Sequence, residues 1–126
     1  MTLRQKQSLF ALNISYLIIW AVENGYEVTL GEAWRTVDQQ RLYFEGYCIL
    51  KVGGDLKLAK ANRKSKTMES RHLYRLAQDL NVFRDGNLLS NKEDFKELAD
   101  YWRHLHQDNI SGYDWDYDYG HFEMKK

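Results

Sequence analysis

The apolar stretch from Ala11 to Val22 most narrows what this chain can fold into. Two polar residues interrupt it, and it is far short of the ~20 residues that a membrane-spanning helix needs. Arg4 and Lys6 precede it as in a secretory leader, but Glu23-Asn24 follows in place of a small-residue cleavage site. We therefore interpret the stretch as part of an amphipathic helix packed in a folded domain.

The residues around this stretch predict where the helix begins and ends and which of its faces is buried. Thr2 and Gln5 have the spacing of a capping box at its start, and Asn24-Gly25 is a stop signal. Apolar residues recur three, four or seven positions apart, which is the periodicity of one helix face. They are Leu3, Phe10, Ile14, Leu17, Ile18 and Ala21.

Length and charge set further limits. A chain of 126 residues fits one domain, residues 1–126, with one core. Its 18 Lys and Arg balance its 18 Asp and Glu, so no overall field draws it to nucleic acid or to an anionic membrane. Any charge-driven contact must be local. Cys48 is the single cysteine and can form no internal disulfide, so we interpret it as a small buried hydrophobe.

The remaining pattern predicts an α+β domain with helices packed on one face of an antiparallel sheet. Ser90 and Glu93 have the spacing of a second capping box, before a helix whose apolar side chains share one face. That face comprises Phe95, Leu98, Ala99, Trp102 and Leu105. The other expected elements are strands at Tyr26 to Leu30, Leu76 to Phe83 and His121 to Met124, and a helix from Thr36 to Glu45 that ends at Gly46.

The segment from Lys51 to Lys66 holds six basic residues against one acid, Asp55. It includes Gly53-Gly54 and has little pattern of a core element, so we predict a surface flap. The simplest interpretation is a solvated face, and the alternative is contact with an anionic partner.

Side chains able to do chemistry gather in two segments, Ser70 to Asp79 and Asp118 to Glu123. A catalytic zinc site takes three protein ligands from histidine nitrogen and carboxylate oxygen. His72, Asp79 and His121 supply such a set. The ligand set predicts a site charge near +1, which favours activation of water and polarisation of a carbonyl, so amide hydrolysis is feasible.

The spacing of these residues implies bends in the chain. Seven residues apart on one unbroken strand, His72 and Asp79 would point to opposite faces, so we place His72 on a loop and Asp79 inside a strand. Asp118 and His121 are three apart and share a strand face only if the chain bends, which Gly120 permits.

Hydrolysis of an amide needs two more groups. A second carboxylate must accept a proton from water and pass it to the leaving amine, and Asp118 is placed for that role. A developing oxyanion needs a fixed positive donor. Arg35, where a strand passes into a helix, is the best candidate, with Arg71 in reserve.

Three groups of residues carry a family resemblance: Trp34-Arg35-Thr36 with Gln39-Gln40, Ser70-x-His72 with Asp79, and Asp118-x-x-His121-Phe122. From about Tyr26 to the C-terminus the chain resembles the M15 family of zinc D-Ala-D-Ala carboxypeptidases and L-alanyl-D-glutamate peptidases, which includes phage endolysins. The stretches that look most like the small phage-type members are Asp79 to Gly86, Tyr101-Trp102 and Gly112 to Trp115.

The resemblance implies an M15/hedgehog-type architecture with zinc on the open side of the sheet. It implies zinc ligation by His72, Asp79 and His121, with Asp118 as general base and Arg35 stabilising the transition state. It also implies that Ser70 helps to hold the substrate and that Gln39 or Gln40 supports Arg35; Arg71 is a further substrate-binding candidate.

The match has three departures. Arg75 stands where many members have glycine, Asp118 replaces the glutamate of the dipeptidase branch and fits the endolysin-like branch, and Gly112 to Trp115 lacks the double glycine common there.

Other polar and aromatic residues receive structural interpretations. His104 and His106 lie about 200° apart around a helix axis, so we predict surface residues rather than joint ligands. Asp114, Asp116 and Glu123 are interpreted as a solvated acidic rim rather than extra ligands. For Trp34, Trp102 and Trp115 we predict positions in the core or in a pocket wall.

The resemblance therefore predicts zinc-dependent cleavage of a bond in the peptidoglycan stem peptide by a phage-type lysis enzyme. The bond can be L-Ala-D-Glu or D-Ala-D-Ala. We expect a monomer that is made in the host cytoplasm without a signal peptide and acts on the wall after release. The alternative is a non-catalytic, zinc-stabilised cell-wall-binding module, which would need neither Asp118 nor Arg35.

Overall fold

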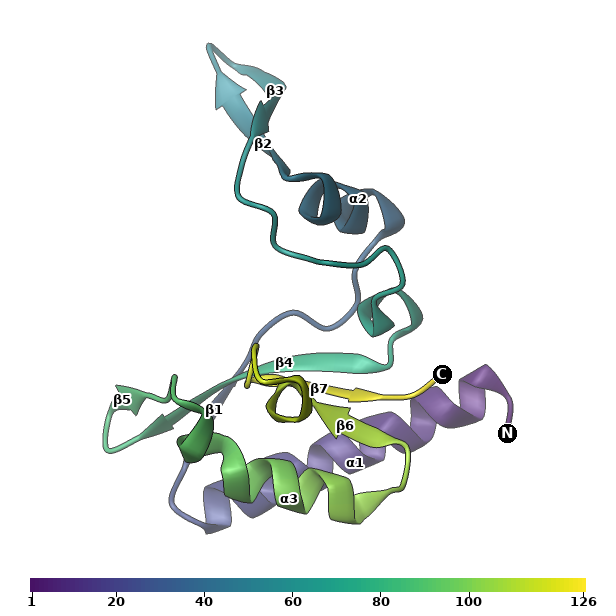
Figure 1. Cartoon of the computed structure of the whole chain (residues 1–126), viewed down its shortest axis with the longest axis vertical. Coiled ribbons are helices and arrows are strands. Elements are labelled where there is room, and N and C mark those ends of the chain that lie inside the picture. The colour runs from purple at the N-terminus through teal and green to yellow at the C-terminus, as the bar shows by residue number, and fades with distance from the viewer.

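An antiparallel sheet organises the body of the molecule, and the computed structural model describes all 126 residues (Figure 1). Its strands lie in the order β1-β4-β7-β6, and a short β5 pairs with β4. Their bounds are Glu27–Leu30 for β1, Ala77–Arg84 for β4, Asn87–Leu88 for β5, Asn109–Ser111 for β6 and His121–Met124 for β7. The predicted α+β class with an antiparallel sheet is confirmed.

Two helices, α1 (Leu3–Glu23) and α3 (Lys96–Leu105), lie together on one side of this sheet (Figure 1). Alternate side chains of β4 and β7 point toward them, including Leu80, Val82 and Phe122, and these pack with Leu17 and Trp102 in one buried cluster. The opposite side of the same strands carries the polar residues. The strands therefore divide the core from a polar face.

The first helix follows the sequence pattern closely. Thr2 and Gln5 form the predicted capping box, in which each side chain accepts a hydrogen bond from the backbone N–H of the other, and the helix stops before Asn24. Leu3 is 42% exposed and so lies outside the buried face. No helix combines the length and the apolarity needed to cross a bilayer.

The start of the third helical region differs from the prediction. A short 3₁₀ turn, η2 (Lys92–Phe95), precedes α3, and Asn91 rather than Ser90 stands at its start. No side chain caps either segment, so the predicted Ser90 and Glu93 box is wrong. The 3₁₀ turn uses its main chain instead, since the backbone N–H of Asp94 donates to Asn91 O at 3.2 Å, and Phe95 at its end is buried in the core.

The basic segment is more ordered than a flap. A helix α2 (Val37–Glu45), capped by Thr36 and ended by Gly46 with φ +79°, leads into a hairpin of β2 (Tyr47–Val52) and β3 (Asp55–Lys60). This hairpin projects away from the body (Figure 1). Cys48 is half-buried within it, not part of the core.

Residues 61–69, which we call the strap, return from the hairpin to the body. The backbone N–H of Ala61 donates to Gly46 O at 2.9 Å, and that of Lys64 donates to Tyr43 O at 3.0 Å. The strap is therefore held against α2 by its own main chain. A 3₁₀ turn, η1 (Arg71–Tyr74), follows it and enters β4.

Two of the tryptophans test the assignment of the core. Trp102 is fully buried, and its indole N–H donates to Ile110 O at 2.9 Å. Trp34 is 53% exposed and so lies outside the core, and it does not line the pocket described below; its ring instead contacts the guanidinium of Arg75 at 4.5 Å.

We predict that Trp102→Ala lowers the free energy of unfolding by about 3–5 kcal/mol, because it removes a large buried side chain. The matched control, Trp34→Ala, is expected to cost at most about 1 kcal/mol, the scale of an exposed cation–π contact. Urea unfolding followed by circular dichroism measures both. Equal losses in the two variants would contradict the assigned core.

Candidate metal centre

Three side chains from three separate elements converge on the polar face of the sheet. His72 comes from η1, Asp79 from β4 and His121 from β7, where Asp79 and His121 are direct cross-strand partners. His72 Nε2 lies 3.2 Å from Asp79 Oδ1 and 3.2 Å from His121 Nδ1, and His121 Nδ1 lies 3.0 Å from Asp79 Oδ1. The structure therefore brings together the three residues predicted as ligands, with Asp79 in a strand as expected.

The outer nitrogen of each imidazole is already occupied by an acceptor. His72 Nδ1 lies 2.5 Å from the carbonyl oxygen of Ala33, and His121 Nε2 lies 2.7 Å from Glu123 Oε2. With the ring protons on these outer nitrogens, His72 Nε2 and His121 Nδ1 direct lone pairs at the centre of the triangle. This arrangement of outer acceptors is typical of metal-bound histidines.

The size of the triangle suits a metal ion. Zinc bonds to histidine nitrogen and carboxylate oxygen at about 2.0–2.2 Å, so ligand atoms in a tetrahedral site lie roughly 3.3–3.5 Å apart. The observed separations of 3.0–3.2 Å are slightly smaller. Three mutually facing acceptors are stabilised by a proton or a metal ion between them, and a small outward shift would accommodate zinc.

The pKa values of His121 and Asp79 also indicate that the site favours positive charge. Burial opposes the charged form of His121, but hydrogen bonds with Asp79 and Glu123 outweigh it and raise its pKa to about 9. Burial also opposes ionisation of Asp79, yet the two imidazoles hold the pKa of this carboxyl below its usual value. The carboxylates thus favour a positive charge at the centre.

Asp118 lies next to this group without joining it. Its Oδ2 is 3.9 Å from His121 Nδ1, and its side chain stays 55% exposed on the pocket side. Partial burial of the carboxylate raises the pKa of Asp118, against the effect of His121, and the charge of Asp79 raises it further. A carboxylate in this position can exchange protons with a molecule in the pocket.

The bend before β7 differs in detail from the prediction. Asp118 itself takes the left-handed conformation, with φ +54°, while Gly120 is needed for another reason. A Cβ at Gly120 would overlap the backbone carbonyl of Leu80, whose N–H donates to Gly120 O at 2.8 Å. Gly120 therefore permits close approach to β4, and Asp118 makes the turn.

A hydrogen-bond network fixes Arg35 at the edge of the pocket. Its backbone N–H donates to His72 O at 3.1 Å, and its Nη1 donates to Gln40 Oε1 at 2.6 Å and to Ser70 Oγ at 3.4 Å. Its Nε donates to Glu32 Oε1 at 2.5 Å. The guanidinium is therefore held from three sides.

Of the two glutamines, Gln40 is the one that contacts Arg35. It is fully buried, and its amide also donates to Ser65 Oγ at 2.8 Å and to Thr67 O at 2.5 Å, which ties Arg35 to the strap. Gln39 instead uses its backbone N–H to complete the cap of α2. The sequence left this choice open because the two positions are adjacent.

Ser70 and Arg71 frame the same pocket. Ser70 Oγ accepts from the backbone N–H of His72 at 3.3 Å as well as from Arg35, so the hydroxyl orders η1. Arg71 lines the pocket and donates from Nη1 to Glu69 O at 3.3 Å. Contact of Ser70 and Arg71 with a substrate stays a prediction.

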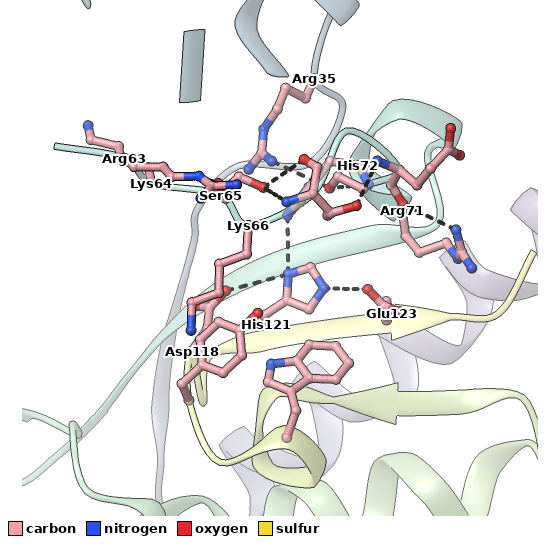
Figure 2. Close-up of a pocket in the computed structure, with 15 residues that line it drawn as sticks. Arg35, Arg63, Lys64, Ser65, Lys66, Arg71, His72, Asp118, His121 and Glu123 are labelled. Carbon is pink, nitrogen blue, oxygen red and sulfur yellow. Dashed lines mark hydrogen bonds and ion pairs between the residues drawn. The ribbon is translucent and has the colours of Figure 1, made fainter. Parts of the chain in front are cut away.

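The pocket has a volume of about 730 Å³ and a basic side (Figure 2). Arg63, Lys64 and Lys66 of the strap line it together with Arg71, and none of the four forms an ion pair with an acidic residue of the chain. Lys66 Nζ instead sits 4.6 Å from the centre of the Tyr117 ring. The pocket is thus suited to an anionic ligand.

The lining of the pocket also confirms one prediction about the aromatic residues. Trp115, in the 3₁₀ turn η3 (Gly112–Trp115), lines the pocket with its ring 5.5 Å from that of His121. Trp115 is therefore a wall residue, as expected.

Glu123 corrects the interpretation of an acidic rim, because its side chain is largely buried and bonds to His121. The signal was available: residues two apart on a strand share a face. Asp114 accepts from the Ser111 backbone N–H, and Asp116 pairs with Lys92 at 2.9 Å. These two acids thus have structural partners outside the metal centre.

His104 and His106 lie apart from the metal centre. His104 is exposed, as predicted, whereas His106 is half-buried and accepts a hydrogen bond from the backbone N–H of Asp108.

Glu32 is a partner of Arg35 that the sequence did not reveal, although it stands only three residues before Arg35. The turn at Arg75 forms without glycine, with φ +56°.

Comparison with known proteins supports the fold. No family model matches this chain, and no curated protein was found as a relative. Among solved structures, it is similar to the L-Ala D-Glu endopeptidase ChiX of Serratia marcescens, with a TM-score of 0.59 and 19% identity. The match covers 86% of this chain and 75% of that one. At this identity the likeness establishes the fold.

We predict that Glu123→Ala weakens zinc binding by about 10–100-fold, because His121 loses the acceptor that orients its ring. Asp116→Ala is the matched control, since that carboxylate pairs with Lys92 at the surface. Competition with a chromophoric chelator measures the affinity. Unchanged affinity in Glu123→Ala would show that this contact does not support the metal centre.

Proposed function

We propose that this protein is a zinc-dependent peptidase that cleaves a bond in the stem peptide of bacterial peptidoglycan. One observation carries the proposal: His72, Asp79 and His121 present three acceptor atoms to one point, with both outer imidazole nitrogens occupied. The likeness in fold to an L-Ala D-Glu endopeptidase supports it.

The donor set fits zinc, and His72, Asp79 and His121 would hold the ion. Zinc bound there would supply Lewis-acid polarisation of the scissile carbonyl and activation of water. The protein supplies everything else. The carbonyl of Ala33 and the carboxylate of Glu123 orient the two imidazoles, and the pocket beside them leaves room for a peptide.

Asp118 is proposed as the proton carrier. Its carboxylate is outside the ligand triangle but on the pocket side, so it can accept a proton from the attacking water and return it to the leaving amine. A purely structural metal site has no use for such a group. Asp118 therefore favours an enzyme over a binding module.

Arg35 is proposed to stabilise the oxyanion that forms on the scissile carbonyl. Its guanidinium is fixed by Glu32, Gln40 and Ser70, so little reorganisation is required when negative charge develops. Arg71 lies in the same pocket and is proposed as a substrate contact together with Ser70.

The basic side of the pocket supports an anionic peptide as substrate. Stem peptides carry free carboxylates, and Arg63, Lys64 and Lys66 line the pocket without acidic partners of their own. We propose a phage-type lysis enzyme that is made in the host cytoplasm and reaches the wall after release. Either L-Ala-D-Glu or D-Ala-D-Ala is the scissile bond, and mass spectrometry of fragments from defined muropeptides identifies which.

We predict that Asp118→Asn retains zinc but loses turnover by about 10²–10⁴-fold, the usual contribution of a positioned acid–base group. Asp116→Asn, two residues away and paired with Lys92, serves as the control and keeps the wild-type rate. Zinc content and release of peptide fragments from purified peptidoglycan are measured in parallel.

The outcomes of that experiment separate the two functions. Wild-type turnover in Asp118→Asn would refute the assignment of the base. If the unaltered protein bound zinc and peptidoglycan but released no fragments, it would be a zinc-stabilised cell-wall-binding module.

We also predict that Lys66→Met raises KM for an anionic stem peptide about two- to fivefold with kcat unchanged, as an exposed ion pair contributes up to about 1 kcal/mol. Lys125→Met, close to the C-terminus, is the control. Steady-state kinetics at low and high salt check this, because the difference shrinks as salt screens the charges. An unaltered KM at low salt would remove Lys66 from substrate binding.

A further inference from the structure

The β2–β3 hairpin carries apolar side chains that the rest of the chain leaves about half exposed or more. It projects from the body with α2 at its base (Figure 1). Five large aliphatic residues on its two six-residue strands are about half exposed or more. They are Ile49 at 56%, Leu50 at 49%, Val52 at 51%, Leu56 at 75% and Leu58 at 62%.

Both faces of the hairpin combine aliphatic and basic side chains. Cross-strand partners share a face, so one face holds the pairs Ile49 with Leu58 and Lys51 with Leu56. The other face holds Leu50 with Lys57 and Val52 with Asp55. Ile49 and Leu58 line a shallow groove beside α2 but stay exposed there. Apolar groups and lysines are thus interleaved on each side.

This composition is unfavourable in water alone. A two-stranded hairpin without a packed face is marginally stable by itself, and burial of its aliphatic side chains would favour its ordered form. A lysine stem can lie along an apolar surface while its ammonium group stays in a polar layer. An interface that is apolar inside and polar at its boundary satisfies both kinds of side chain.

The charge of the hairpin and strap indicates which charge the partner surface carries. Lys51, Lys57 and Lys60 form no ion pair within the chain, and Asp55 is the single acid of the hairpin strands. The strap adds three more basic residues and one acid, Glu69, while the whole protein has a net charge of zero. The positive charge is therefore concentrated here, where it complements an anionic surface.

A second copy of this chain fits the hairpin poorly. The two strands supply six residues each, whereas a stable protein interface takes about 20–30 residues a side. Pairing two hairpins would also bring their lysines together. Of the surfaces that combine apolar depth with negative charge, a bilayer of anionic phospholipid matches both properties.

We propose that the β2–β3 hairpin docks this protein on anionic phospholipid membranes. The exposed aliphatic side chains enter the boundary between headgroups and acyl chains, and Lys51, Lys57 and Lys60 contact the phosphates. Asp55 opposes this docking. The contact is peripheral and requires neither the metal centre nor peptidase activity, so it is independent of the proposed function.

Sedimentation of the full-length protein with vesicles tests the proposal. One set of vesicles is phosphatidylcholine alone, and the other contains phosphatidylglycerol as well. We expect binding to the second set that weakens with added salt, and much weaker binding to the first. Failure to bind phosphatidylglycerol vesicles at low salt would overturn the proposal.

Matched variants locate the contact. Leu56→Ser with Leu58→Ser should lower the partition coefficient by roughly tenfold or more, because it removes apolar surface that would be buried in the bilayer. Lys51→Gln with Lys57→Gln should lower it by a similar factor, because each basic residue near an anionic surface contributes roughly a factor of five. Ile19→Ser with Val22→Ser, exposed at 53% and 58% on α1, is the control and should bind as the wild type. Asp55→Asn should strengthen binding.

The remaining outcomes also decide the matter. Full binding by the leucine variant would mean that charge alone holds the protein to lipid, and would overturn insertion of the hairpin. Concentration-dependent self-association that the same leucine variant abolishes would assign the face to a second copy instead. Circular dichroism of each variant confirms that the body remains folded, which the projecting position of the hairpin favours.

Discussion

The pairing of Asp79 with His121 across β4 and β7 is the constraint on which the rest of the site depends. Because side chains alternate along a strand, this one register sends Leu80 and Phe122 into the core and the two polar residues to the other face. A slip by one residue would bury the carboxylate and expose the core. The hydrophobic effect therefore fixes the geometry of the polar group.

Supports outside the ligand triangle then determine how well it is ordered. Ala33 and Glu123 fix the two imidazoles, while Gln40 and Ser70 fix Arg35. These contacts join the β1–α2 connection, the strap, η1 and β7, which are distant in sequence. The chemistry that we propose thus rests on groups held by hydrogen bonds within the chain, next to a basic and open pocket.

The sequence predicted correctly those features that depend only on residues close together in the chain. The capping box of Thr2 and the stop at Gly46 need only neighbouring residues, and the structure confirms both. The Ser90 cap failed because the chain enters α3 through a 3₁₀ turn that starts at Asn91 and in which Asp94 N–H donates to Asn91 O. Glu123 was misread because its partner depends on which face of β7 turns to the metal centre, although its spacing from His121 contained the clue.

The hydrogen bond from Ala61 to Gly46 closes the base of the hairpin, so the chain leaves α2 and returns to it at almost the same point. The fourteen residues between the two positions form a loop that can change in length or composition without altering the path of the backbone on either side. The hairpin is thus closed off from the body at its base, and replacing its residues would leave the backbone around the metal centre in place.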